Sequence, residues 1–428
     1  MGRGSVFSPL RIVETSYCDA PLEIFDPCVA NGEMTPVISN ESELYVAPGG
    51  PTGRLTYRIA RYGRRSAVGR IIGLLLITWV PMCVLALLQG YALGATPRES
   101  FLLDFATYVR FFVAVPILVI AEGHIGPRLT QAGLQFVRDG IVRQEDYPAF
   151  EQAIARLARR RESVTATLVI IALAVFGACL ITFESASGIG MASLHSVTLP
   201  ESHAFRYNLE ALWSLMVALP VFLFLWYRWL WRLLFWTLFL HDVARLNLQL
   251  VPTHADGAGG LGFLARAHNA FGMLAFVVGS AISAEAAFRV VYEGAGIGVF
   301  EVPALITIML VLVLFLGPVL VFTPVMARSR QAALKSYGSL VVRYNRAFQD
   351  KWLESPGPQG EQLLGSSDIQ SLADLGNSYR LVSDMKLIPF GRSAVIQLAV
   401  ATLLPGLPLL LLAVPISDIL AALAKVLL

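Results

Sequence analysis

The chain has 428 residues, of which 56% are hydrophobic and only 15% are charged, and its formal net charge is +3. Soluble domains carry about 25% charged residues, so this composition excludes an ordinary soluble protein and favours a membrane protein. The small net charge gives no indication of a nucleic-acid partner.

The first part of the chain, residues 1–53, is polar, aperiodic and dotted with Pro, Gly, Asn and Glu. This composition predicts a flexible cytoplasmic N-terminal arm without a packed core. Arginines then cluster before the first apolar run, at Arg54, Arg58, Arg61, Arg64, Arg65 and Arg70. Such a cluster is typical of anchoring at the anionic cytoplasmic face of a membrane. The first apolar run begins near residue 71, so we expect a retained span and not a cleaved signal.

Seven long apolar runs follow, and about 20 helical residues suffice to cross the hydrocarbon core. The runs predict spans at 71–93, 102–122, 163–183, 209–227, 264–290, 300–325 and 392–413. The last run contains Pro405 and Pro408, which should kink it. The fold class is therefore an all-α polytopic transmembrane helical bundle of about seven spans, formed by residues 54–428.

Basic residues between the runs gather on one side of the predicted bundle. Nearly all of them lie in 54–70, 124–162, 228–262 and 327–390, and the other side has little beyond Arg98 and Arg206. Positively charged loops stay in the cytoplasm. We therefore expect a multi-pass protein of a cytoplasmic membrane, with a cytoplasmic N-terminus, a periplasmic C-terminus and the lipid bilayer as a partner.

The fourth run is the hardest to delimit, because it continues past residue 227 through tryptophans mixed with Arg228 and Arg232. A straight helix over 209–246 would be about 57 Å long, well beyond the core of about 30 Å. We expect the helix to leave the bilayer or to bend along its surface, with the Trp and Arg residues as an interfacial belt. An aromatic ligand cage is the alternative interpretation.

The cytoplasmic segments 124–160, 230–262 and 327–385 are predicted to form a layer of amphipathic helices. One apolar stripe comprises Tyr147, Phe150, Ile154 and Leu157, and a second comprises Leu334, Tyr337, Val341, Tyr344 and Phe348. These 3-4 spacings place each stripe on one helix face. The stripes pack on each other or on a second subunit. Ser367 to Gln370 resembles a capping box that opens a further helix.

The sharpest local motif is the glycine-rich segment 252–263, just before the fifth run. Gly257, Gly259 and Gly262 match a dinucleotide-binding spacing, but no strand precedes them and a span follows, so we reject that reading. A tight glycine-dependent turn with Asp256 capping the fifth span is the favoured interpretation. A ligand or anion site is the alternative, formed by His254, Asp256, Gly259 and Gly260.

Charged residues inside the runs are the other site candidates, because charge facing lipid is costly. Arg110 and Glu285 lie at similar depth, and we expect them to pair across the bundle. The alternative is that Arg289 neutralises Glu285 one turn away. Glu122 should reach water at the inner end of the second run. Two further residues, Arg266 and His268, are predicted to line a cytoplasmic vestibule with the glycine-rich segment. Small residues around Glu285 permit close helix packing or leave room for a polar cavity.

The outer loop 184–207 holds His195, Glu201 and His203, which are suitable residue types for zinc but lack a fixed scaffold. Sequence motifs of hydrolases, kinases, nucleotide-binding proteins and metalloproteases are not found in the chain. The sequence therefore names no cofactor and argues against an enzyme.

Two stretches resemble a group of bacterial multi-pass inner-membrane proteins of uncharacterised activity: 250–264 and 367–375, together with Arg110 to Phe112 and Ala121-Glu122. The likeness covers residues 70–428. Ala255 stands where the group's glycine motif, PTHxDxAGGLGFL, usually has proline after the histidine. The resemblance implies a bacterial inner-membrane location and topology, and it implies no activity.

A channel or transporter for a small solute or ion is the leading functional prediction, based on kinked spans, buried charges and the glycine-rich mouth. The alternative is a non-catalytic membrane scaffold or sensor that binds a partner through its cytoplasmic helices. A homo-oligomer and a cytoplasmic protein partner both remain open. A continuous polar cavity would favour transport, and a dry bundle with an exposed apolar cytoplasmic patch would favour the scaffold.

Overall fold

The computed structural model describes residues 64–90, 92–94, 97, 100–161, 163–186, 209–354 and 365–409. Within these residues, seven helical stretches are long and apolar enough to cross a membrane. We number them as spans 1 to 7: Ala67–Leu88, Phe105–Arg138, Val164–Thr182, Leu209–Ala244, Gly262–Tyr292, Ile297–Trp352 and Arg392–Leu409. The predicted all-α bundle of seven spans is confirmed, and the described ranges contain no β-strand. The chain is therefore an integral membrane protein. The predicted N-terminal arm and the predicted zinc ligands lie outside the described residues.

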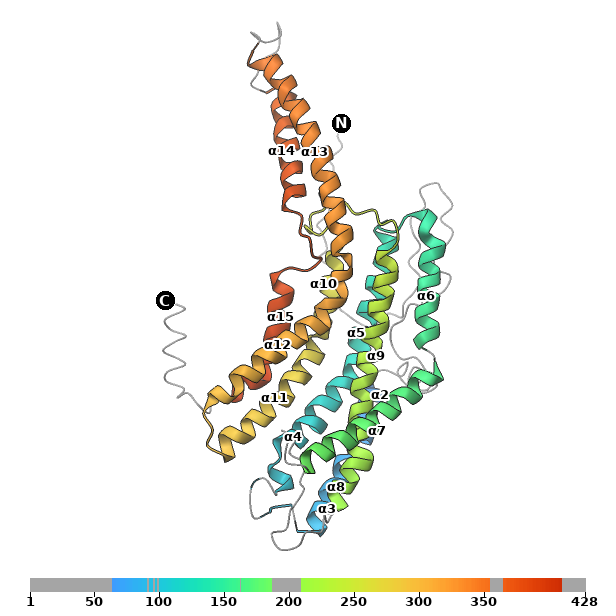
Figure 1. Ribbon diagram of the computed structural model, residues 1–428, viewed down its shortest axis with the longest axis vertical. Helices are drawn as coiled ribbons and strands as arrows, with labels where there is room; N and C mark the ends of the chain where they lie inside the picture. Colours follow the sequence, from blue (N-terminus) through green and yellow to red (C-terminus); the bar gives the residue numbers. More distant parts are fainter. Residues whose placement is uncertain are drawn as a thin grey trace, which may run out of the picture. The chain divides into compact units, whose positions relative to one another are not determined.

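Spans 2 and 4 are long helical stretches (Figure 1), and each is interrupted by a wide π-helical turn. Span 2 consists of α4 (Phe105–Tyr108), a π-helical turn η3 (Val109–Ala114) and α5 (Val115–Arg138). Span 4 consists of α8 (Leu209–Trp213), a π-helical turn η5 (Ser214–Ala218) and α9 (Leu219–Ala244). A proline follows each wide turn, Pro116 and Pro220. Proline has no N–H to bond an earlier carbonyl, so the helix widens before it.

The first half of the bundle is completed by span 1, span 3 and the helix α6. Span 1 comprises α2 (Arg64–Ile77) and α3 (Trp79–Leu88), which pack on α5 and α8 respectively. Span 3 is α7 (Val164–Ala186), which packs along α9. Short 3-10 turns, η2 (Phe101–Leu103) and η4 (Gln144–Asp146), precede α4 and α6. The last of the three is α6 (Tyr147–Arg161), which packs on the far part of α9.

The second half of the bundle is formed by spans 5, 6 and 7. Span 5 contains α10 (Gly262–His268), η6 (Asn269–Phe271) and α11 (Gly272–Tyr292). Span 6 contains η7 (Ile297–Phe300), α12 (Glu301–Leu316), η8 (Gly317–Phe322) and α13 (Thr323–Trp352). Span 7 contains α15 (Arg392–Leu403) and η9 (Leu404–Gly406), so the expected irregularity occurs at Pro405. Close packing, one of the two predictions for the small residues of α11, is observed at Gly279, where an added Cβ would collide with the Thr402 carbonyl oxygen.

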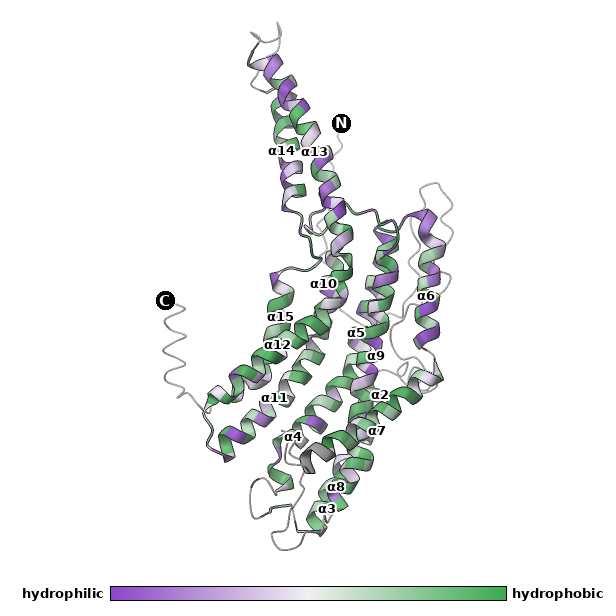
Figure 2. Ribbon diagram, in the orientation of Figure 1, coloured by the Kyte–Doolittle hydropathy of each residue, from purple (hydrophilic) through white to green (hydrophobic). Residues whose placement is uncertain are grey.

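Hydropathy agrees with a bilayer around these spans. Figure 2 shows apolar residues over most of α7 and α12, and mixed polar and apolar residues on α6 and α13. Large apolar side chains such as Phe176 on α7 and Val313 on α12 are more than half exposed. Water would penalise such faces, whereas lipid tails accept them.

The two apolar stripes both find partners within the chain, but not each other. Phe150 on α6 is fully buried, and its ring lies 5.9 Å from that of Phe239 on α9. The second stripe lies on α13, where each of its members is partly buried, and α13 packs against α14 (Ser367–Asp384) as a helical hairpin (Figure 1). The predicted packing of one stripe on the other is therefore wrong.

Two further expectations about these segments need correction. The segment predicted as helical over 230–262 is helical only to Ala244, and turns follow up to α10. No capping box opens α14, because its first helical residue is Ser367 and no side chain caps it. The Asp368 carboxylate instead accepts hydrogen bonds from Lys351 Nζ and Trp352 Nε1, which hold its pKa below the ordinary value. These bonds join the last turn of α13 to the first turn of α14.

Candidate functional site

A single carboxylate, Glu122 on α5, is surrounded by three arginines from two other helices. Arg70 of α2 donates from Nη1 to Oε2 at 2.9 Å. Arg232 of α9 donates from Nη2 to Oε1 at 3.0 Å, and Arg228 Nη1 lies 3.3 Å from the same oxygen. We call these four residues the arginine cluster. The prediction that Glu122 reaches water is wrong, because its side chain is only 10% exposed.

The sequence brings these groups together through helix periodicity and one aromatic side chain. Arg228 and Arg232 are four residues apart and therefore project from the same face of α9. Trp229 lies between them, and its Nε1 donates to the carbonyl of Leu118, one turn before Glu122 on α5, at 3.0 Å. The Arg232 guanidinium stacks 4.7 Å from the centre of the Trp229 ring. These contacts fix α9 against α5 at the level of the cluster.

The arginine cluster has more positive charge than negative charge. Three guanidinium groups meet one carboxylate, and within the described residues no second acid forms an ion pair with any of them. Two buried donors, Nε of Arg70 and Nη2 of Arg228, find no hydrogen-bond partner in the described part of the chain. Buried donors are normally satisfied, so the cluster retains capacity for a further acceptor.

A second polar cluster, formed by Asp104, Arg110 and Glu210, lies at the opposite end of spans 2 and 4. Asp104 starts α4, because its Oδ1 accepts from the Ala106 N–H at 2.9 Å. Arg110 and Glu210 both lie close enough to Asp104 to interact with its charge. From Asp104 to Glu122 the helix advances 18 residues, or about 27 Å at 1.5 Å per residue. Asp104 and Glu122 are therefore nearly the thickness of a hydrocarbon core apart, about 30 Å, and Arg110 lies between them along span 2.

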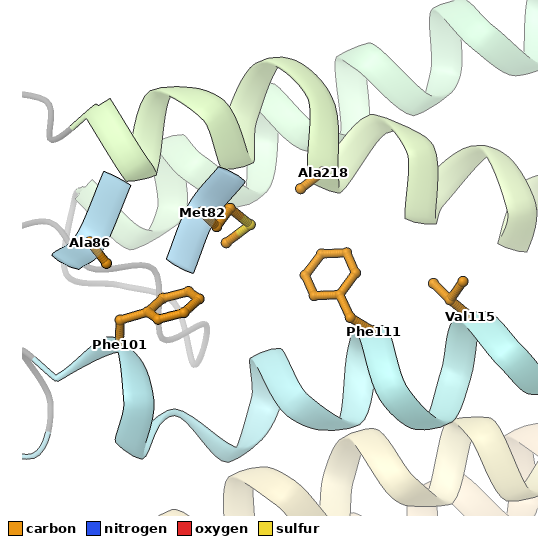
Figure 3. Close-up of a cluster of buried hydrophobic side chains, with 6 residues drawn as sticks. All are labelled: Met82, Ala86, Phe101, Phe111, Val115 and Ala218. Atoms are coloured by element: carbon orange, nitrogen blue, oxygen red, sulfur yellow. The ribbon is translucent and has the colours of Figure 1, made fainter. Parts of the chain in front are cut away.

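An apolar layer packs between spans 1, 2 and 4, and its members Phe111, Val115 and Ala218 lie between the two clusters along spans 2 and 4. It consists of Met82, Ala86, Phe101, Phe111, Val115 and Ala218, all at most 2% exposed. In Figure 3 the side chains of Phe111 and Val115 point toward Met82 and Ala218 across the space between spans 2, 1 and 4. Phe111 and Ala218 belong to the π-helical turns η3 and η5. The interrupted parts of the two helices therefore each contribute one side chain to the apolar layer.

The glycine turn, residues 252–262, has the structure that we favoured from the sequence. Gly257, Gly259 and Gly260 have positive φ angles of 62°, 67° and 97°. Asp256 Oδ1 accepts from the N–H groups of Ala258 and Gly260, and Oδ2 accepts from Gly262, the first residue of α10, at 2.8 Å. The predicted tight turn with Asp256 capping the fifth span is confirmed.

The electrostatics of the glycine turn are balanced internally. Burial of the Asp256 carboxyl would raise its pKa, but the N–H groups of Ala258, Gly262 and Gly260 and the half-exposed His254 hold the pKa below its ordinary value. The N–H groups that an anion would need are already bound to Asp256. This geometry favours a structural role for His254, Asp256, Gly259 and Gly260.

His268 lies in the core with hydrogen-bond partners for both ring nitrogens, and it does not line a vestibule. It is completely buried on α10. Its Nε2 accepts from Trp236 Nε1 at 2.9 Å, and its Nδ1 lies 2.5 Å from the Phe315 carbonyl oxygen. Since the tryptophan can only donate and the carbonyl can only accept, the proton sits on Nδ1 and the ring is neutral. Arg266, from the same helix, is exposed.

The predicted pairing of Arg110 with Glu285 does not form. Arg289 Nε donates to Glu285 Oε1 at 2.9 Å, so the alternative, a pair one turn apart on α11, is what the structure contains. The Arg110 guanidinium lies 5.8 Å from the Phe222 ring on α9. Equal depth in the membrane was a poor guide, because it does not fix the direction in which each side chain points.

Several residues of the two clusters were not singled out from the sequence. Arg70 was interpreted as a membrane anchor and Arg228 and Arg232 as an interfacial belt, and Glu210 was not considered. One signal was available: two arginines four residues apart inside an apolar run require a buried acid or water on that face. No group of three or more metal-ligating side chains occurs within the described ranges.

Comparison with known proteins provides no assignment, because no protein family, curated protein or solved structure matches the chain.

Proposed function

We propose that the protein is a transporter or channel for a small solute or ion, with its path between spans 1, 2 and 4. One observation carries the proposal: spans 2 and 4 together hold two groups of buried charges, and the apolar side chains of Phe111, Val115 and Ala218 lie between these groups. Buried ionisable groups are expensive in a membrane and normally mark a solute or ion pathway. Apolar constrictions are a common way to close such a pathway.

The two π-helical turns support this proposal. Wide turns have fewer regular hydrogen bonds than α-helix and are frequent at functional sites. Phe111 and Ala218 sit on them, so converting either turn to regular helix would rotate that residue away from the layer. Because apolar side chains fill the space between spans 1, 2 and 4, we infer that a conformational change precedes passage, which favours a transporter over an open channel.

We further infer the orientation and location of the protein. The arginine cluster belongs at the cytoplasmic end, because arginines are retained on that side. The second polar cluster, around Asp104, then faces the periplasm. The likeness of the glycine turn to a group of bacterial inner-membrane proteins supports the same membrane, and Ala255 in place of proline is the one departure from that motif.

The proposal is tested by loosening the layer. In proteoliposomes, Phe111→Ala should increase the flux of potassium or chloride over the wild type, because truncation opens a gap in the apolar layer. Phe176→Ala is the matched control, since Phe176 is 61% exposed on the lipid side of α7. Equal flux through both variants and the wild type would contradict a path at this position.

Cys83 gives an independent measurement of the same layer. It packs beside the layer, whereas Cys179 is exposed on α7. In a background with Cys18, Cys28 and Cys179 changed to Ser, a charged methanethiosulfonate reagent should modify Cys83 slowly in the wild type and faster with Phe111→Ala. An unchanged rate would indicate that water does not enter between these spans.

A scaffold or sensor is the second candidate, and two observations favour it. The first is the apolar packing between spans 1, 2 and 4, which is expected of a sealed bundle. The second is that the α13–α14 hairpin has exposed apolar side chains, Leu340, Val342, Ile369 and Leu381, each at least 40% exposed. Such residues normally face a partner. Replacing Val342 and Leu381 by Ser should then lower the oligomeric state in nanodiscs, whereas an unchanged mass in nanodiscs would remove support for a second copy at this surface.

A further inference from the structure

We infer that the arginine cluster is a binding site for a phosphate-type oxyanion. The inference goes beyond the proposed function and does not depend on it, because an anion can be held at this site without any passage through the bundle. It rests on the charge balance, the unsatisfied donors, the chemistry of arginine and the access to the cluster.

The arginine cluster carries an excess of positive charge. Arg70, Arg228 and Arg232 all contact the single carboxylate of Glu122, which leaves two positive charges without a counter-charge among the described residues. Like charges confined in a medium of low dielectric repel strongly. A bound dianion would neutralise this excess, whereas a neutral solute would not.

The free donors point to the same kind of ligand. Nε of Arg70 and Nη2 of Arg228 are buried and have no acceptor within the described ranges. Both belong to guanidinium groups that already contact Glu122 through another nitrogen. A guanidinium offers five N–H donors in a planar fork, which matches the oxygens of a phosphate group in a bidentate manner. Arginine is therefore the residue type expected for this ligand.

Access to the cluster is from the side of α2. The side chain of Arg70 is 23% exposed, whereas those of Arg228 and Arg232 are 14% and 9% exposed. Arg228 lies 19 residues after the start of span 4, or about 29 Å along the helix, which is the depth of a lipid headgroup boundary. The oxyanion can therefore come from a lipid headgroup or from free phosphate in the adjoining water.

A purely structural role for the cluster makes a different prediction. If Glu122 and the three arginines only lock α2, α5 and α9 together, anions should have no specific effect on any variant. If the cluster binds an oxyanion, the negative charge of Glu122 opposes that anion at the same guanidinium groups. Removing the charge of Glu122 should then strengthen anion binding even though it weakens the lock.

The experiment measures thermal unfolding of the full chain in nanodiscs. One arm titrates inorganic phosphate against chloride at constant ionic strength in phosphatidylcholine discs. The other arm compares phosphatidylcholine discs with discs that also contain phosphatidic acid. An increase in Tm in the first arm identifies free phosphate as the ligand, and an increase in the second arm alone identifies the lipid headgroup. No increase in either arm would overturn the inference.

Variants make the assignment specific to the cluster. Arg228→Gln should weaken the anion affinity by about tenfold, the usual cost of losing a charged hydrogen-bond partner, and Glu122→Gln should strengthen it. The matched control is Arg156→Gln, because Arg156 pairs with Asp242 elsewhere, Nη2 to Oδ2 at 3.0 Å, and its anion response should equal that of the wild type. If Arg228→Gln does not fold, Arg228→Lys keeps the charge but loses the fork and should bind more weakly. An unchanged response in the Arg228 variant, or a weaker one in Glu122→Gln, would contradict the site.

Discussion

Asp256 and Glu122 are both carboxylates that hold several donors, but the donors differ in kind and in origin. Asp256 binds neutral N–H groups at most six residues away in its own turn. Glu122 binds cationic side chains that are 52 and 110 residues away in the chain. The first arrangement closes on itself, because each contact stays within one loop. The second joins three helices and leaves unbalanced charge, so it is the better place to look for function.

The largest expected effect comes from Glu122→Ala. It leaves three guanidinium groups together in a buried position without an acid, and removing one partner of a buried ion pair typically costs about 3–5 kcal/mol. Glu285→Ala is the matched control: its partner Arg289 is 31% exposed, so the cost should stay below about 1 kcal/mol. Unfolding in nanodiscs measures both. Equal losses would show that the charges of the cluster are as well solvated as those at Glu285.

Asp256→Ala should have the next largest effect. Three N–H groups lose their acceptor and α10 loses its cap, which we expect to cost about 1–2 kcal/mol. Amide hydrogen exchange should accelerate at Ala258, Gly260 and Gly262 and stay unchanged around Glu122. His254→Ala is the comparison: it removes one half-exposed contact, from Nδ1 to Asp256 Oδ1 at 2.9 Å, and leaves the three N–H bonds intact, so its effect should be smaller. A change in exchange that spreads to α5 and α9 would mean that the two carboxylates are coupled.

These two sites also explain what the sequence could predict. The glycine turn was predictable, because its acceptor, its donors and the glycines with positive φ all lie between Asp256 and Gly262. The seven spans were predictable for the same reason, since each run is local. The arginine cluster was not, because each of its arginines has a sufficient local explanation at a membrane boundary. Only the packing of α2, α5 and α9 shows that these arginines meet one acid.

The pairing of Arg110 with Glu285 failed for a related physical reason. Glu285 has Arg289 one turn away on its own helix, and a partner on the same helix is already positioned without any tertiary contact. A partner on another helix must also match in the direction of its side chain, which depth alone does not provide. The π-helical turns before Pro116 and Pro220 were missed too, although the prolines that cause them were visible in the sequence.

A smaller effect is expected from Gly259→Ala, which sharpens the description of the glycine turn. Gly259 has φ 67°, and an added Cβ would lie 2.8 Å from Cε of Met385. Gly140→Ala is a matched control with φ 64° and open space around the added atom. The left-handed conformation should cost each variant about 1 kcal/mol. A further loss in Gly259→Ala alone, seen as a lower Tm, would measure the contact with Met385, and equal values would show that this flexible side chain moves away.

The smallest effect is the response of the glycine turn to pH. The pKa of Asp256 is lower in the folded protein than its unperturbed value of about 3.9. A carboxylate of this kind contributes stability that is fully present above the unfolded pKa and is lost as pH falls through the folded pKa.

The difference in Tm between the wild type and Asp256→Asn should therefore be constant from neutral pH down to about pH 5 and shrink below about pH 4. A difference that already shrinks at a pH well above about 5 would contradict the assignment to the Asp256 carboxyl. Because protonation leaves one carbonyl oxygen able to accept, the turn should loosen without unfolding, and exchange at Gly262 should rise less than in Asp256→Ala.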